Sequence, residues 1–204
     1  AKLQIDARQK IKQIIEERLK KKEISFKLSK SFSTPKRLVI VIDGIPETIE
    51  QKKKIIKGPK VDVSQVALDG FIKSNNLNKP DIYKKKIEKG EFYFAETKPE
   101  VIDVVKELQL IIPEALQGYS WKKSMKWSVY DLSWGRPLKS IIAILNNKVI
   151  NFAFFHLQSN NLTLIDGMNE DKIKKVSSFK SYLNILESQN IILDQEKRKN
   201  IILK

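Results

Sequence analysis

One stretch of the chain, residues 121–158, limits most sharply what the protein can fold into. It contains all three tryptophans. Two apolar runs of strand length, residues 141–145 and 149–155, flank a short polar segment that contains Asn146 and Asn147. Asparagine tolerates the positive φ angles of a tight turn between antiparallel strands. The stretch therefore predicts a β-hairpin, which any fold of this chain has to accommodate.

Arg136 comes just before this hairpin, between Gly135 and Pro137 and directly after Trp134. Proline stiffens the backbone at this point, so the arginine side chain starts from a fixed position. Its guanidinium could stack on an indole ring or bind an anionic group. The alternative interpretation is a structural salt bridge.

The composition excludes several kinds of site. The chain has no cysteine, so disulfides and thiolate metal sites are ruled out, and we expect no metal cluster and no Ser-His-Asp set around its one histidine, His156. We interpret His156 as a structural residue within an apolar strand. No apolar run approaches the roughly 20 residues that cross a bilayer, and the first residues are polar, unlike a signal peptide. We expect a cytoplasmic protein with no membrane contact, no metal and no catalytic residue.

The net charge of +15 points toward a polyanionic partner such as RNA. Only five of the 39 basic residues are arginine, however, and isoleucine and asparagine are abundant. This pattern is typical of an AT-rich genome, so part of the charge can reflect codon usage. A merely solvated basic face is therefore the alternative to nucleic-acid contact.

The hydrophobic pattern predicts an α+β fold, with antiparallel or mixed sheets and hairpins packed against amphipathic helices and a helical extension at the end. Helices are expected at residues 2–23, 64–75, 100–118 (with a kink or restart at Pro113) and 179–188, and from Asp194 onward. Strands are expected at residues 25–33, 38–42 (buried on both faces), 81–87 and 91–98, and Asp166-Gly167 is expected to form a turn.

Three regions follow from this pattern. Residues 1–118 form an N-terminal α+β region, residues 119–165 a Trp-rich loop and β-hairpin packing on it, and residues 166–204 a helical extension leading toward further domains. No internal repeat, phosphate-binding glycine loop or zinc pattern is present in the sequence.

Six short motifs follow one another along the chain: FSTPKRL at residues 32–38, KGP at 57–59, GF at 70–71, KGE at 89–91, MKW at 125–127 and WGRP at 134–137. In order and spacing they resemble the N-terminal part of the beta subunit of bacterial heterotetrameric glycyl-tRNA synthetase. Two features depart from that family: its usual opening Glu-Ile-Gly-Thr-Glu-Glu-Leu-Pro strand is absent before Ala1, and Met168 follows Gly167 where a Gly-His-Arg-Phe turn is expected.

The resemblance implies a division of labour between two subunits. In the family, the alpha subunit makes glycyl-adenylate from glycine and ATP, so ATP and Mg are expected there and no cofactor in this chain. The beta subunit contributes tRNA binding. The implied partners are the alpha subunit, in an α2β2 tetramer, and tRNA(Gly). A stand-alone basic RNA-binding module and a purely structural interface domain are the alternatives.

Candidate residues follow from the motifs that carry the resemblance. Side chains that could contact tRNA or a subunit interface are Lys36, Arg37, Lys57, Lys126, Trp127 and Arg136. Residues that could instead fix the shapes of the loops are Thr34, Pro35, Gly58, Pro59 and Pro137. For every one of them a purely architectural role is the competing interpretation.

Overall fold

The computed structural model describes residues 2–50, 55–87, 90–97, 101–127, 129, 131–165 and 173–203. The predicted α+β class is confirmed, because helices alternate with small antiparallel and mixed sheets. Contacts divide the chain into a main unit, Ala1–Thr48 with Asp103–Lys204, and an inserted unit, Ile49–Ile102. The division at residues 118 and 165 stays a prediction, and the compact units of the structure follow different boundaries.

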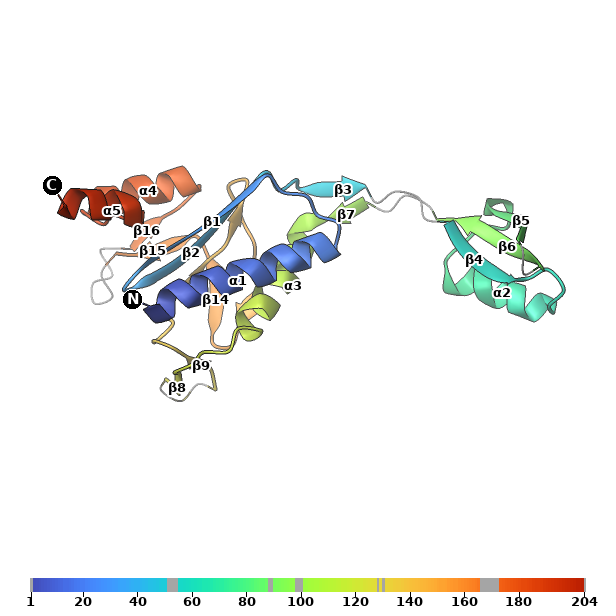
Figure 1. Cartoon of the computed structure of the whole chain (residues 1–204), viewed down its shortest axis with the longest axis horizontal. Coiled ribbons are helices and arrows are strands. Elements are labelled where there is room, and N and C mark those ends of the chain that lie inside the picture. Colours follow the sequence, from blue (N-terminus) through green and yellow to red (C-terminus); the bar gives the residue numbers. More distant parts are fainter. Residues whose placement is uncertain are drawn as a thin grey trace. The chain divides into compact units, whose positions relative to one another are not determined.

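The main unit begins with α1 (Lys2–Lys21), the predicted amphipathic helix. Its buried residues, Ala7, Ile11, Ile15 and Leu19, recur every four positions and so lie on one face. Figure 1 shows α1 running along the hairpin of β1 (Leu28–Thr34) and β2 (Arg37–Asp43), and α1 also contacts α3 (Val104–Gln117).

The β1–β2 hairpin confirms the two predicted strands, and its register pairs Thr34 with Arg37 across a turn made by Pro35 and Lys36. The prediction that residues 38–42 are buried on both faces is wrong. Each of these residues is only half-buried, because a two-stranded sheet leaves its side chains close to an edge.

The helix predicted from residue 100 begins later. Residues Val101–Asp103 form β7, which pairs with β3 (Thr48–Glu50), and α3 then runs from Val104 to Gln117. The Asp103 carboxylate accepts hydrogen bonds from the backbone N–H groups of Val105 and Lys106 at 3.0 and 3.4 Å, which fixes the helix start. Pro113 lies inside α3 without ending it.

The predicted hairpin has the expected turn but not the expected long strands. Asn146 and Asn147 have φ angles of 46° and 65°, and they join β11 (Ile144–Leu145) to β12 (Lys148–Val149). The remaining short strands of this region are β8 (Met125–Lys126), β9 (Ser133–Trp134), β10 (Ile141–Ile142), β13 (Ala153–Phe154) and β14 (Leu157–Asn160). β10 pairs with β14 in parallel, and β13 pairs with β14 in an antiparallel hairpin.

Ser159 explains why the second strand is broken. This buried side chain accepts a hydrogen bond from the N–H of Phe152 at 2.8 Å and donates one to the carbonyl of Ile150 at 2.7 Å. The hydroxyl therefore replaces strand partners for these backbone groups. His156 follows Phe155, whose φ is 53°, in the exposed turn between β13 and β14, so the prediction that it lies within an apolar strand is wrong.

The end of the chain is helical, as predicted. After β15 (Leu162–Leu164) and β16 (Ile173–Lys175) come α4 (Phe179–Glu187) and α5 (Gln195–Ile202). Asp194 caps α5 by accepting hydrogen bonds from Glu196 and Lys197. Tyr182 and Leu186 of α4 are buried in a core cluster with Val176. The turn predicted at Asp166-Gly167 lies outside the described residues.

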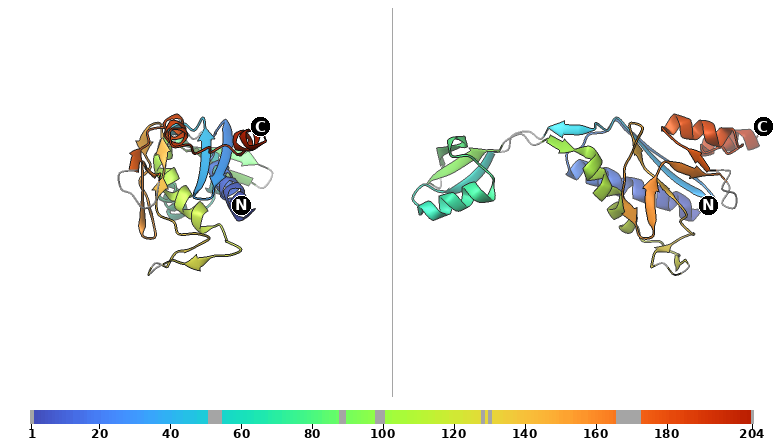
Figure 2. Two further views of the ribbon diagram at one scale, coloured as in Figure 1. Left: turned by 90° about the vertical axis from the view of Figure 1, so that its left-hand side faces the viewer. Right: turned by 180° about the vertical axis from the view of Figure 1, so that it is seen from behind.

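The inserted unit is a three-stranded antiparallel sheet with one helix. Its strands, in the order β4-β6-β5, are β4 (Ile55–Lys60), β6 (Gly90–Glu96) and β5 (Ile82–Ile87), and the helix is α2 (Gln65–Ser74). A 3₁₀ turn, Lys79–Asp81, precedes β5. The predicted β5–β6 hairpin is confirmed. The view from behind in Figure 2 shows α2, in teal, along one side of this sheet.

Candidate functional site

The described residues contain no group of three or more His, Cys, Asp or Glu side chains that could hold a metal ion. None of the helices within the same ranges combines the length and apolarity that crossing a membrane needs. The candidate residues are lysines, arginines and aromatic side chains, which are the types that can contact phosphates and nucleobases.

The Thr-Pro turn is fixed from several sides. Thr34 is buried, and its Oγ1 accepts a hydrogen bond from the N–H of Lys36 at 3.3 Å. Gln4 of α1 donates its side-chain N–H to the Pro35 carbonyl at 2.8 Å. These contacts hold the turn in place, and the loop-shaping role of Thr34 and Pro35 stays a prediction.

Arg37 and Lys36 differ sharply in their surroundings. Arg37 is half-buried and donates from Nη2 to the Leu164 carbonyl at 2.6 Å, and its guanidinium also bonds the hydroxyl of Tyr182. Burial raises the pKa of Tyr182, with Arg37 and Thr163 acting in the opposite direction. Lys36 is exposed, and its side chain forms no hydrogen bond or ion pair within the described ranges. Lys36 is thus the cation of this turn that a ligand can reach.

The Lys-Gly-Pro segment lies in β4 of the inserted unit. The Nζ of Lys57 sits 3.6 Å from the centroid of the Phe92 ring, a cation–π contact. A Cβ added at Gly58 would come within 2.8 Å of the Phe71 ring of α2, so glycine permits the close approach of helix and sheet. The register shifts between Lys57 and Lys60, and Pro59 lies in this irregular part of the strand.

The Met-Lys-Trp segment is joined to the Trp-Gly-Arg-Pro segment by the pairing of β8 with β9. Lys126 contacts Asp131 at 2.8 Å, and this hydrogen bond raises the pKa of the lysine and lowers that of the carboxylate. Both groups are exposed, so the ion pair itself stabilises little. The indole N–H of Trp127 donates to the Trp134 carbonyl at 2.9 Å, which is a structural contact.

Arg136 lies beside a cluster of aromatic rings. Trp121 packs edge-on against Trp134 at 4.9 Å and against Tyr119 at 5.0 Å. A Cβ at Gly135 would lie 2.4 Å from the Trp121 ring, so the loop that carries Arg136 is pressed onto the indole. Arg136 and Pro137 are exposed, and within the described part of the chain the Arg136 guanidinium makes no ion pair or hydrogen bond. The salt-bridge interpretation thus has no support among these residues.

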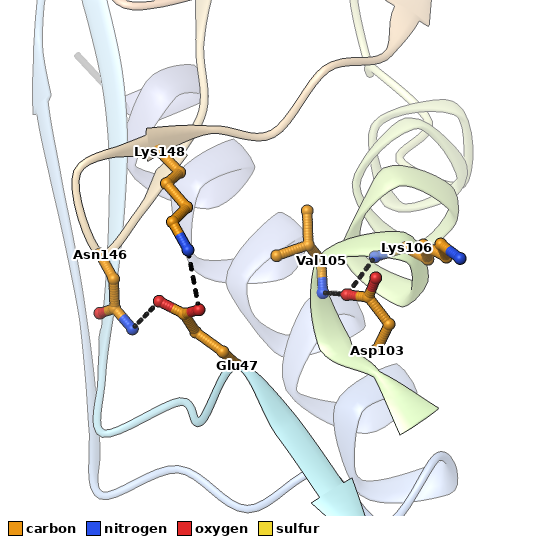
Figure 3. A network of polar contacts seen from close by, with 6 residues as sticks. All are labelled: Glu47, Asp103, Val105, Lys106, Asn146 and Lys148. Atoms are coloured by element: carbon orange, nitrogen blue, oxygen red, sulfur yellow. Dashed lines mark hydrogen bonds and ion pairs between the residues drawn. The ribbon is translucent and has the colours of Figure 1, made fainter. Parts of the chain in front are cut away.

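Glu47 is a contact residue that no sequence pattern indicated. Its carboxylate accepts hydrogen bonds from Asn146 at 3.2 Å and Lys148 at 3.0 Å, at the two sides of the hairpin turn (Figure 3). Its backbone carbonyl accepts from the N–H of Val104 at 2.9 Å. The pKa of Glu47 is lowered, chiefly by the bond from Lys148. About one hundred residues separate Glu47 from Asn146 and Lys148, so no local sequence pattern could predict the contact.

The structure therefore brings Lys126, Trp127 and Arg136 together in one loop region. Arg37 lies elsewhere, in the β1–β2 hairpin, where it is bonded to the Leu164 carbonyl. Lys57, Gly58 and Pro59 belong to the other compact unit. Sequence reasoning placed Phe92 and Phe94 on one face of a hairpin but did not name them as site residues, and Phe92 is the ring that Lys57 contacts.

The fold and these residues define a basic α+β module with exposed cations. Comparison with known proteins supplies the family: the sequence model described as glycyl-tRNA synthetase beta subunit matches residues 1–204. The proteins named glycine–tRNA ligase beta subunit in Rickettsia typhi and Rickettsia canadensis are 35% identical to the chain over 171 and 173 residues. These matches cover 84% and 85% of this chain but 26% of each relative.

The protein of that name in Rickettsia prowazekii is 33% identical over 171 residues. The chain thus belongs to the glycyl-tRNA synthetase beta subunit family, a family of aminoacyl-tRNA synthetase subunits, and the resemblance carried by the six motifs is confirmed. It spans about a quarter of the length of the curated relatives that it matches.

Proposed function

We propose that this chain supports tRNA binding and the assembly of alpha and beta subunits during ATP-dependent charging of tRNA(Gly) with glycine in the cytoplasm. The match of the whole chain to the beta-subunit family carries this proposal. The alpha subunit of an α2β2 tetramer would bind ATP and Mg and perform the chemistry. This chain would contribute no catalytic residue.

The exposed cations support the RNA part of the proposal. Arg136 projects from a loop that Gly135 holds against Trp121, so its backbone is ordered before any ligand binds. Lys36 is likewise exposed at the tip of a fixed turn. A pre-ordered cation loses less conformational freedom when it contacts a phosphate, and arginine can grip phosphate with two parallel hydrogen bonds.

A purely structural interface domain is the second candidate, and the geometry of Arg37 favours it. The guanidinium is already engaged by Leu164 and Tyr182, so this motif residue has an architectural role whether or not RNA is near. The two candidates differ in what they predict for the salt dependence of tRNA affinity, because RNA binding uses the charge of Arg136 to neutralise a phosphate.

The experiment that tests the proposal measures tRNA affinity against salt concentration, using the alpha–beta complex. Arg136→Ala should weaken binding and reduce the slope of log affinity against log salt by about 0.9, the contribution of one neutralised phosphate of a duplex. Lys20→Ala, which removes an equal charge from an exposed position of α1, is the matched control and should leave the slope unchanged. An unchanged slope for both variants would contradict the RNA-binding role of Arg136, and the interface role would be the only one of the two candidates to remain.

A further inference from the structure

The sheet of the inserted unit has one face rich in rings and lysines. Side chains of cross-strand partners lie on the same face of a sheet, and side chains alternate along each strand. The register pairs Phe94 with Lys57 on one side and Tyr83 on the other, and it pairs Phe92 with Lys60 and Lys85. We call this set the platform face: Lys57, Lys60, Tyr83, Lys85, Phe92 and Phe94.

The helix α2 covers the opposite face. Ala95, which alternates with Phe94, is fully buried, and Gly58, which alternates with Lys57, lies directly under the Phe71 ring of α2. Within the described residues of this unit, no helix covers the platform face. Tyr83 remains 39% exposed there, and Phe92 and Phe94 are half-buried.

The rings and charges of the platform face are arranged in pairs. Tyr83 and Phe94 are nearly parallel, with 6.1 Å between centroids and 23° between ring planes. Lys57 and Lys60 approach the Phe92 ring at 3.6 and 5.9 Å. The Nζ of Lys85 lies 5.9 Å from the Phe94 centroid. Glu96 adds one carboxylate at the end of the same face, opposite Ile55.

We propose that the platform face binds unpaired nucleotides of RNA, with bases stacked on Tyr83 and Phe94 and phosphates held by Lys57, Lys60 and Lys85. An exposed sheet face that combines aromatic rings with lysines is what single-stranded nucleic acid needs, because every base has a face to stack and every linkage a negative charge. A base-paired helix cannot use the rings. The inference rests on the proposed role in tRNA binding, and it names the kind of nucleotide that this unit contacts.

Charge complementarity selects this occupant over an apolar protein surface. The lysines flank the rings on both outer strands, and Glu96 is one carboxylate against three ammonium groups, so an apolar partner would have to bury an excess of positive charge. A nucleotide strand supplies both partners, because its phosphates are the counter-charges for the lysines and its bases stack on the aromatic rings. A second protein with an acidic surface is the competing outcome.

The test uses the 204-residue chain and a labelled single-stranded RNA of about ten nucleotides, a length within the usual site sizes of such surfaces. The RNA carries 2-aminopurine, whose fluorescence is quenched when it stacks. The intact chain should bind and quench it, and a blunt RNA duplex of the same length should bind more weakly. Phe94→Leu and Tyr83→Leu should each weaken binding about tenfold and reduce the quenching, whereas Tyr83→Phe, which keeps the ring, should retain both.

Neighbouring residues on the other face give matched controls. Lys85→Ala should weaken binding and lower the salt slope by about 0.7, the single-strand value, while Lys84→Ala in the same strand should not. Tyr93→Leu serves likewise as the control for Phe94→Leu. Circular dichroism identifies a variant that fails to fold. If the leucine variants do not fold, the binding of Tyr83→Phe and Lys85→Ala decides whether the platform face binds RNA.

Equal losses for Lys84→Ala and Lys85→Ala, or binding without quenching, would overturn the platform proposal. So would equal affinity for single strand and duplex, or binding of acidic peptides but not RNA. The wider proposal fails differently. If the alpha–beta complex binds tRNA with an affinity that depends on Arg136 but the chain does not bind single-stranded RNA, only the proposal for the platform face is wrong.

Discussion

Arg37 donates a hydrogen bond to the backbone carbonyl of Leu164, 127 residues further along the chain, at 2.6 Å. The same guanidinium bonds Tyr182 of α4. A single side chain of the β1–β2 hairpin thus ties together segments that the sequence keeps far apart. Its position in the Thr-Pro-Lys-Arg motif is explained by this contact without any ligand.

Arg37→Ala should lower the free energy of unfolding by about 1–3 kcal/mol, because the Leu164 carbonyl and the buried Tyr182 hydroxyl would lose a charged donor. Urea unfolding checks this. Lys36→Ala, one residue away but exposed, should stay within about 0.5 kcal/mol of the unmodified chain. If Arg37→Ala instead kept full stability and lost RNA affinity, the side chain would serve a ligand and not the fold.

Gly135→Ala should destabilise the main unit by about 1–3 kcal/mol, since the new methyl group would lie 2.4 Å from the Trp121 ring and force the loop to move. The change in tryptophan fluorescence and the urea midpoint both report it. Gly70→Ala is the matched control: nothing lies within 4 Å of its added Cβ, and it sits inside α2. That substitution should stabilise by about 0.5–1 kcal/mol, and a loss comparable to that of Gly135→Ala would contradict the steric argument.

Ser159→Ala should cost about 1–3 kcal/mol, because the Phe152 N–H and the Ile150 carbonyl would be left unpaired in a buried site. Amide hydrogen exchange at Phe152 should accelerate along with the loss of stability. Ser188→Ala removes an exposed hydroxyl that bonds the Ile185 carbonyl, and it should have little effect. Unaltered exchange at Phe152 in the Ser159 variant would show that another group satisfies its N–H.

The sequence was sufficient where structure is decided by neighbours along the chain. The Asn146-Asn147 turn, the helix at residues 2–23 and the helix from Asp194 onward depend on local sequence, and each was predicted. The prediction of one continuous strand over residues 149–155 was wrong because Ser159, which lies outside the hairpin, bonds the backbone of Phe152 and Ile150.

The candidate site, like the fold, could be predicted from the sequence only where it depends on neighbouring residues. Its motif residues could be named from the sequence, but the distinction between the engaged Arg37 and the exposed Arg136 depends on partners such as Leu164 that only the fold brings near. The platform face likewise depends on a cross-strand register. The alternation of Phe92 and Phe94 was visible, whereas their pairing with Lys60 and Lys57 required β4 to be placed beside β6.

Tyr119 should make the stability of the main unit fall at alkaline pH. Burial, assisted by the hydrogen bond to Asp6 at 3.1 Å, raises the pKa of this tyrosine to about 12. In the unfolded chain the hydroxyl titrates near 10, so the unfolded state loses its proton first. The tyrosine's contribution is therefore complete below about pH 10 and is lost as the pH rises to about 12. The informative quantity is the difference from Tyr119→Phe, which has no proton to lose at this position, because other effects of alkaline pH are common to both proteins. The difference in unfolding free energy between the two proteins should shrink between these pH values, and a constant difference would mean that Tyr119 ionises as readily in the folded chain as in the unfolded one.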